Sequence, residues 1–206
     1  LGEGPADRQA AMELAATLGS DVDRDEWAAA CAHEGLAPAD AAVEELLERG
    51  LARDDGHVFS FSSGMLREAL LERAAQAERA AAHHRAAAAA IGEGAAPASS
   101  GPARSERRGR HLLAAGDARD AIDPLLLAAE ARLGGGEAGR AEALVTDLEA
   151  ALDASVPARV RARLAILHAD ACRLEGRYDD AAAWLERAEG FETELDHAER
   201  ARTYAV

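Results

Sequence analysis

The types and spacing of His168 and Cys172 make this pair a candidate for a chemical site. Their i, i+4 spacing would place an imidazole and a thiol on one face of a helix, as in a helical metal pair. A tetrahedral zinc site needs more ligands, and no second cluster at a recognisable spacing supplies them. The adjacent His83 and His84 would point in different directions on a helix. We therefore expect no bound metal, a core or groove position for His168, and interhelical or solvated polar contacts for His83 and His84.

The motifs of known catalytic sites do not occur in the sequence. All 23 basic residues are arginine, which excludes a P-loop lysine and a Schiff-base lysine within this chain. There is no nucleophile elbow and no Ser/His/Asp signature, and Gly134-Gly135-Gly136 suits the turn between two helices better than a phosphate loop. We expect a chain that is not an enzyme and binds no cofactor, with any ATPase located upstream of Leu1 in a longer protein.

The charge balance bears on the possible partners. The 38 acidic residues give a net charge of -15, so the electrostatic attraction that drives nucleic-acid binding would be a repulsion here. An acidic membrane surface is disfavoured for the same reason, and no apolar run approaches the ~20 residues of a membrane span. Two cysteines far apart in the sequence do not suggest a disulfide framework. These features predict a cytoplasmic protein without direct contact to nucleic acid or membrane.

The stretch from Glu44 to Arg73 changes structural type twice and organises the first part of the chain. A helical apolar stripe stops at Gly50, two strand-like runs flank the turn at 54–56, and helical spacing returns from Met65. Earlier helices are expected at 7–18, after an N-cap at Asp23, and from Pro38. This order of elements is the layout of a winged-helix domain with a small hairpin, and we assign residues 1–73 to it.

The third helix would read bases in a winged helix that binds DNA. Its polar positions carry a net charge of -3 and include no Asn or Gln to pair with adenine. These positions are Asp40, Glu44, Glu45, Glu48 and Arg49. A DNA-binding transcription factor fragment is therefore the alternative, and the acidic third helix argues against it.

Three arginines at helical spacing follow a low-complexity segment. Helices are expected at about 65–73 and 76–91, either separate or fused into one. Residues 92–103, rich in Gly, Ala, Ser and Pro, predict a mobile loop. Arg104, Arg107 and Arg108 then lie in 74–115, the only segment with a net positive charge, +3. They suit either a solvated helix start or docking onto the acidic winged helix.

The remainder of the chain repeats. A Gly-x-x-x-x-Ala pattern starts at Gly136 and again at Gly176, forty residues later, with a third copy at Gly116. Helices are expected near 104–115, 118–133 and 137–152, followed by a final pair on either side of Gly176. The one-sided stripes of that pair are Val160, Leu164, Leu167, Ala171 and Leu174, then Tyr178, Ala181, Leu185 and Ala188. A terminal helix is expected at 194–206. The sequence thus predicts an all-α protein with a helical repeat array over 74–206.

Two segments carry a resemblance to a known family. The run Leu46 to Leu51, followed after a turn by Phe59 to Leu70, resembles the winged-helix segment of bacterial STAND-type signalling ATPases. That family includes large ATP-binding LuxR-type activators and cyclase-linked or kinase-linked AAA-type regulators. Arg79, His83, His84 and Arg85 match the arginine-and-histidine helix expected next.

The repeats are similar to the longer bacterial tetratricopeptide repeats. Gly176, Tyr178, Ala181 and Ala188 occupy characteristic places. The resemblance implies a protein or peptide partner in the repeat groove, and contact with an upstream ATPase domain in the same protein.

Ser63 departs from the family pattern. It stands where the family has a histidine associated with sensing the bound nucleotide, and a short hydroxyl cannot reach as far as an imidazole. Ser62 or Ser63 would instead cap the next helix.

We hypothesise that the chain is the non-catalytic regulatory and protein-interaction region of a larger STAND-type signal-transduction protein or transcriptional regulator. Helix-pair repeats commonly take up a peptide or a helix on their inner face. Polar positions on the first helices of the pairs, Arg161 and His168, join the three arginines as candidate partner-binding residues.

Overall fold

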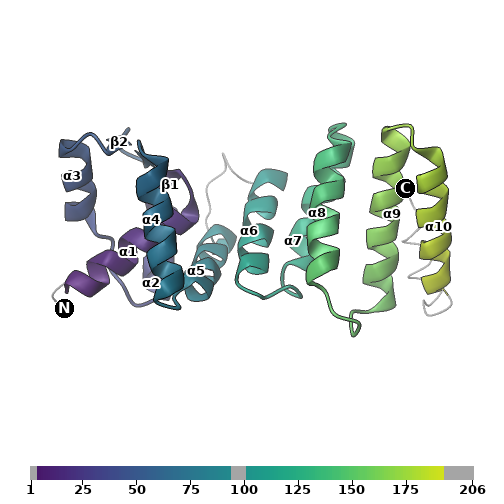
Figure 1. Cartoon of the computed structure of the whole chain (residues 1–206), viewed down its shortest axis with the longest axis horizontal. Coiled ribbons are helices and arrows are strands. Elements are labelled where there is room, and N and C mark those ends of the chain that lie inside the picture. The colour runs from purple at the N-terminus through teal and green to yellow at the C-terminus, as the bar shows by residue number, and fades with distance from the viewer. Residues whose placement is uncertain (1–3, 94–100, 193–206) are drawn as a thin grey trace. The chain divides into compact units, whose positions relative to one another are not determined.

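The computed structural model describes residues 4–93 and 101–192, and it is mostly helical with a small three-stranded antiparallel sheet near the N-terminus (Figure 1). The chain forms two compact units, residues 1–98 with 114–116 and residues 99–113 with 117–206. The centre of the predicted loop at 92–103 and the predicted helix at 194–206 lie outside the described residues.

The first unit contains the predicted order of helices and hairpin. Its elements are α1 (Pro5–Leu18), β1 (Asp21–Asp23), α2 (Arg24–His33), α3 (Asp40–Glu48), β2 (Ala52–Asp54), β3 (Val58–Phe61), α4 (Gly64–Gln76) and α5 (Ala80–Glu93). The predicted N-cap of α2 is confirmed, because the Asp23 carboxylate accepts hydrogen bonds from the backbone N–H groups of Asp25 and Glu26.

The sheet has one more strand than the sequence predicted. Its order is β1-β3-β2, and β1 pairs antiparallel with β3, with Val22 opposite Phe59. The strand β1 has only three residues, two of them aspartates. This is too short to show the alternation of apolar and polar residues by which a strand is predicted from sequence. The Ser60 hydroxyl on β3 donates a 2.6 Å hydrogen bond to Asp21 at the start of β1.

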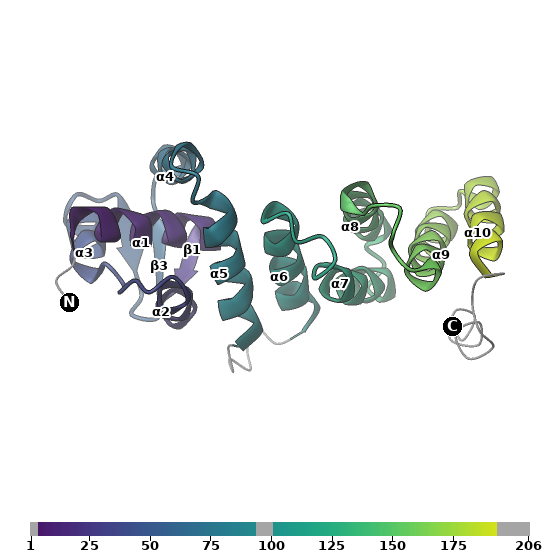
Figure 2. The same cartoon turned by 90° about the horizontal axis from the view of Figure 1, so that it is seen from below.

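Aromatic rings from α2 and β3 form the centre of the first core. Trp27 is 1% exposed, meets Phe59 edge-on at 5.3 Å between ring centroids, and donates its indole N–H to the backbone oxygen of Ala11 at 2.9 Å. Cys31 is fully buried in the same core, as the sequence predicted, and burial raises the pKa of its thiol to about 12. Around this core α1 packs against α2, α4 and α5 (Figure 2).

A sharp break separates α4 from α5. Glu78 has a φ of +57°, which is unusual for a residue with a side chain, and Arg79 N–H bonds to the oxygen of Ala74 at 2.9 Å. The break turns α5 back onto α1 and α2, so α5 belongs to the first unit. The first unit therefore extends beyond the boundary predicted after residue 73.

The second unit consists of consecutive helices connected by short turns (Figure 1). Its described helices are α6 (Pro102–Ala114), α7 (Ile122–Gly134), α8 (Ala138–Ala151), α9 (Ala158–Leu174) and α10 (Tyr178–Glu192). The predicted helix at 118–133 begins instead at Ile122, which places Pro124 in the first turn. Backbone N–H groups in the first turn have no partner within the helix, so the missing N–H of proline costs no hydrogen bond there.

The repeated Gly-x-x-x-x-Ala pattern corresponds to a repeated turn. Gly116, Gly136 and Gly176 all adopt left-handed φ values of 76–83° after a helix. In each turn the residue after the glycine donates its N–H to the oxygen five residues earlier, at 2.8–2.9 Å, and thereby closes the helix end. The alanine of each pattern is at most 7% exposed; these alanines are Ala121, Ala141 and Ala181. The sequence pattern therefore predicted both the turns and the buried small residues.

Small residues also allow the helices to approach closely. Gly109 on α6 is buried, and a Cβ atom placed on it would lie 2.4 Å from Cγ of Leu125 on α7. The glycine therefore sets how near α6 and α7 can pack.

Candidate functional site

Ser63 is the N-cap residue of α4. Its hydroxyl accepts a hydrogen bond of 3.4 Å from the backbone N–H of Leu66. This is the capping role that the sequence offered as the alternative to nucleotide sensing.

A buried polar cluster joins three helices of the first unit. Arg79, the residue immediately before α5, donates three hydrogen bonds of 2.7–3.0 Å to the carboxylate of Glu13 on α1. His83 places Nδ1 2.6 Å from Glu34 Oε1 and Nε2 3.5 Å from Glu13 Oε2. The side chains of Glu13 and His83 are fully buried. The predicted interhelical polar contacts of His83 are thus confirmed.

The chemistry of this cluster is limited by access. Burial by itself would raise the pKa of Glu13, but hydrogen bonds from Gln9 and Arg79 outweigh it and hold that pKa below its usual value. Burial, followed by the nearby His83, lowers the pKa of His84. A carboxylate beside an imidazole can exchange protons, but with Glu13 and His83 fully buried no substrate reaches them. The cluster positions helices instead.

The three predicted arginines of α6 differ in their exposure. Arg104 and Arg107 are half-buried, whereas Arg108 is exposed. Glu106, on the same helix, accepts two hydrogen bonds from Arg132 of α7 at 2.8 and 3.0 Å. The side of α6 that carries these arginines is therefore partly buried. Their contact with a partner protein stays a prediction.

Arg161 and His168 both face the aromatic rings of α10. The guanidinium of Arg161 lies 4.9 Å from the ring centroid of Phe191. His168 is 3% exposed and stacks nearly parallel on Trp184, with ring centroids 4.2 Å apart. Burial lowers the pKa of His168 although Glu149, 3.4 Å away, opposes that effect. The structure thus brings these two predicted residues together in one helix pair. Both side chains contact α10 and do not lie on an open face.

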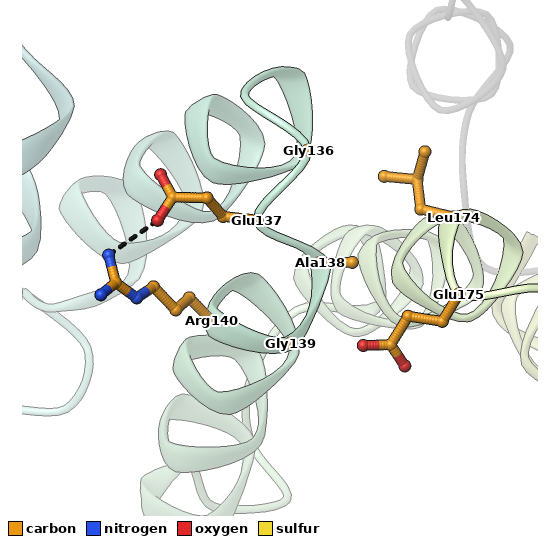
Figure 3. A pocket seen from close by; sticks show the side chains of 7 residues that line it. All are labelled: Gly136, Glu137, Ala138, Gly139, Arg140, Leu174 and Glu175. Atoms are coloured by element: carbon orange, nitrogen blue, oxygen red, sulfur yellow. Dashed lines mark hydrogen bonds and ion pairs between the residues drawn. The ribbon is translucent and has the colours of Figure 1, made fainter.

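A shallow pocket of about 350 Å³ lies between two of the repeated turns (Figure 3). Its lining residues are Gly136, Glu137, Ala138, Gly139, Arg140, Leu174 and Glu175. Arg140 donates a 2.7 Å hydrogen bond to Glu137 (Figure 3). Glu137 also accepts hydrogen bonds from Arg132 at 2.8 and 3.0 Å. The hydrogen bond from Arg132, opposed by desolvation, is the main reason that the pKa of Glu137 is below its usual value. Sequence reasoning missed this pocket, although the two copies of the glycine pattern marked its walls.

Exposed apolar side chains gather near the end of the described repeats. Among the large hydrophobic residues that are exposed in the described parts of the chain, three of five fall within residues 174–185. These are Leu174 at 48%, Tyr178 at 69% and Leu185 at 43% exposure. Exposed apolar surface rimmed by charges is typical of sites where proteins bind other proteins.

Metal-ligand clusters and membrane-spanning helices are both absent from the described residues. Within residues 4–93 and 101–192, no group of three His, Cys, Asp or Glu side chains could hold a metal ion. His168 and Cys172 are thus not joined there by a third ligand. No described helix has the length and apolar content needed to cross a bilayer.

Comparisons with protein-family models, with curated proteins and with solved structures find no match to this chain. The function proposed below therefore rests on the sequence and on the geometry described above.

Proposed function

We propose that this chain is the non-catalytic regulatory and protein-interaction region of a larger STAND-type signalling protein, composed of a winged-helix unit and tetratricopeptide-like repeats. The observation that carries the proposal is the threefold recurrence of one turn geometry at Gly116, Gly136 and Gly176, each followed by a buried alanine. Helix pairs repeated in this way stack on their neighbours and present extended surfaces that commonly bind peptides or helices.

The first unit supports the winged-helix assignment. Its element order, α1–β1–α2–α3–β2–β3, is that of a winged helix, with β2 and β3 forming the wing hairpin. The buried cluster of Glu13, Arg79 and His83 ties α5 to this unit, and two of its members are residues that match the family's arginine-and-histidine helix.

The surface of α3 favours a protein partner over DNA. Its exposed side chains are dominated by carboxylates, and Arg49 beside it forms an ion pair with Glu45. Arg24 is likewise neutralised by Asp40 and by Asp54 of the hairpin. Few cations remain on this side to contact phosphates, which is a poor basis for DNA binding.

The test applies three kinds of assay to the full chain. Calorimetry with ATP and with ADP should show no binding, and gel shifts with random and genomic duplexes should show no specific complex at ~0.15 M salt. Selection from a random peptide library displayed on phage should enrich peptides that bind the folded chain. Micromolar nucleotide binding or a specific DNA complex would overturn the proposal, and so would the failure of any peptide to bind.

A further inference from the structure

The two sides of α10, the last helix that the structure describes, have different surroundings (Figure 1). The side toward α9 carries Ala181 and Ala188, which are at most 7% exposed, and the half-buried Trp184. On another side Tyr178 and Leu185 are 69% and 43% exposed. Since helical residues recur every 3.6 positions, these two side chains lie one above the other, two turns apart.

A continuous apolar stripe results from this spacing. Ala182 is exposed and lies between Tyr178 and Leu185 at i+4, so residues 178, 182 and 185 share one side of the helix. Exposed apolar side chains that line up on one side of a helix form a surface typical of sites where proteins bind other proteins. An exposed tyrosine and leucine on one line are therefore suited to contact with a further helix.

Carboxylates that pair with no described residue lie along the border and at the end of the stripe. Asp179, Glu186 and Glu189 are exposed, and none of them forms an ion pair within the described parts of the chain. The neighbouring charges are matched, since Asp180 pairs with Arg177 and Arg187 pairs with Glu149. The negative charge left over on α10 thus lies next to its exposed apolar side chains.

We propose that this side of α10, formed by Tyr178, Asp179, Ala182, Leu185, Glu186 and Glu189 and termed the α10 flank, docks an amphipathic helix of a partner protein with arginine or lysine along its apolar stripe. The inference rests on the proposed interaction function and names the partner class. Apolar contact would supply affinity, and the opposite charges would favour the correct partner. A second copy of the chain fits poorly, because two α10 flanks would place like charges against each other.

The dimensions of α10 indicate the length of that partner helix. Its 15 residues extend about 22 Å at 1.5 Å per residue. A partner helix of roughly three to four turns, with apolar residues at i, i+4, i+7 and i+11, would cover the stripe from Tyr178 past Leu185.

The test is fluorescence anisotropy of the full chain with two designed 15-residue helical probes. Both probes carry leucine at i, i+4, i+7 and i+11; one has arginine beside the stripe and its twin has glutamate at the same positions. The arginine probe should bind at least roughly tenfold more tightly than its twin, and raising the salt should weaken that binding. The double variant Tyr178→Ala, Leu185→Ala should weaken it about tenfold or more.

Matched variants separate the α10 flank from general attraction to an acidic protein. Leu127→Ala removes a leucine of α7 that is 53% exposed, against 43% for Leu185, and should leave binding unchanged. The triple variant Asp179→Asn, Glu186→Gln, Glu189→Gln should remove the preference for the arginine probe. All these side chains are exposed, so thermal melts should show an intact fold for every variant.

Three results would overturn the inference. The first is equal binding of both probes, and the second is equal loss of binding in the Leu127 variant. The third is sedimentation as a dimer that the Tyr178 and Leu185 variant dissociates, because the occupant would then be a second copy. If neither probe binds but library-selected peptides do, the inference fails while the proposed function stands; if no peptide of any kind binds, both fail.

Discussion

Arg79 and Glu13, 66 positions apart in the sequence, form a bidentate ion pair with a shortest N–O distance of 2.7 Å. Glu13 is fully buried, so its charge depends on this guanidinium and on the adjacent His83. Arg79 reaches Glu13 because Glu78 adopts a left-handed conformation and starts α5 in a new direction. The break between the two helices and the ion pair to the buried Glu13 are thus parts of one arrangement.

Removing Arg79 should destabilise the first unit strongly. We expect Arg79→Ala to lower the free energy of unfolding by roughly 3 kcal/mol, since it leaves the Glu13 carboxylate buried without its main partner. Urea denaturation of the full chain measures the change. Arg73→Ala is the matched control; Arg73 is exposed and bonds to Gln9, so its loss should cost less than about 0.5 kcal/mol.

A double-mutant cycle with Glu13→Ala tests the pairing itself. The combined variant should lose much less unfolding free energy than the sum of the losses in the two single variants. With both side chains removed, no unpaired charge remains at the site. Additive costs would contradict the pairing.

Much of the helical framework could be predicted from the sequence because its signals are local. Glycines at 50, 116, 136 and 176 end helices through a backbone conformation that other residues disfavour, and the apolar periods between them give the helices. The strand β1 could not be predicted, because its structure comes from pairing with β3 and not from its own residues. The break between α4 and α5 was predicted at 74–75 and lies at 77–79, since no glycine marks the position at which Glu78 turns the chain.

The candidate site was less predictable because it depends on how side chains are oriented. His168 is polar and lies on a first helix of a pair, features that suit a groove, yet a neighbouring aromatic ring on α10 covers it. Conversely, Tyr178 and Leu185 were predicted to face the first helix of the pair, as part of its partner's apolar stripe, but both are exposed. A periodic pattern shows which residues share a side of a helix but not which neighbour covers that side.

Gly109 should not tolerate a side chain. Gly109→Ala places a Cβ atom 2.4 Å from Cγ of Leu125, so α6 and α7 must separate or Leu125 must move. We expect a loss of about 1–3 kcal/mol in unfolding free energy through overpacking.

Gly134→Ala is the control for this change, because a Cβ atom there would meet nothing within 4 Å. It should leave stability unchanged or raise it by up to ~1 kcal/mol through helix propensity. Equal effects of the two substitutions in thermal melts would show that Gly109 is not a close-packing position.

His168 should make the protein less stable in mild acid. Burial against Trp184 lowers the pKa of its imidazole from the ordinary value near 6.5, so the unfolded chain takes up a proton at a higher pH than the folded chain does. Its contribution to stability is therefore complete above about pH 6.5 and is lost as the pH falls below that value.

The variant His168→Phe keeps a ring for stacking but cannot be protonated. Urea denaturation at pH 7.5 and 5.5 should show a smaller loss on acidification for this variant than for the unmodified chain. His57→Gln, at the exposed hairpin, is the control and should retain the full loss. If His168→Phe shows the same loss as the unmodified chain, the imidazole is not the group responsible.

Ala181 should accept a larger side chain poorly. It is 7% exposed at the position where the repeated pattern places a buried alanine on the second helix of a pair, and α10 packs there against α9. Ala181→Leu adds three carbon atoms to this contact and should cost roughly 1–3 kcal/mol, because the helices must separate or the new side chain must leave its preferred rotamer. Ala183, two residues along the same helix, is exposed, so Ala183→Leu should change stability by less than about 0.5 kcal/mol. Urea denaturation of both variants measures the difference, and a cost for Ala183→Leu as large as that for Ala181→Leu would refute the assignment of Ala181 to the contact between α9 and α10.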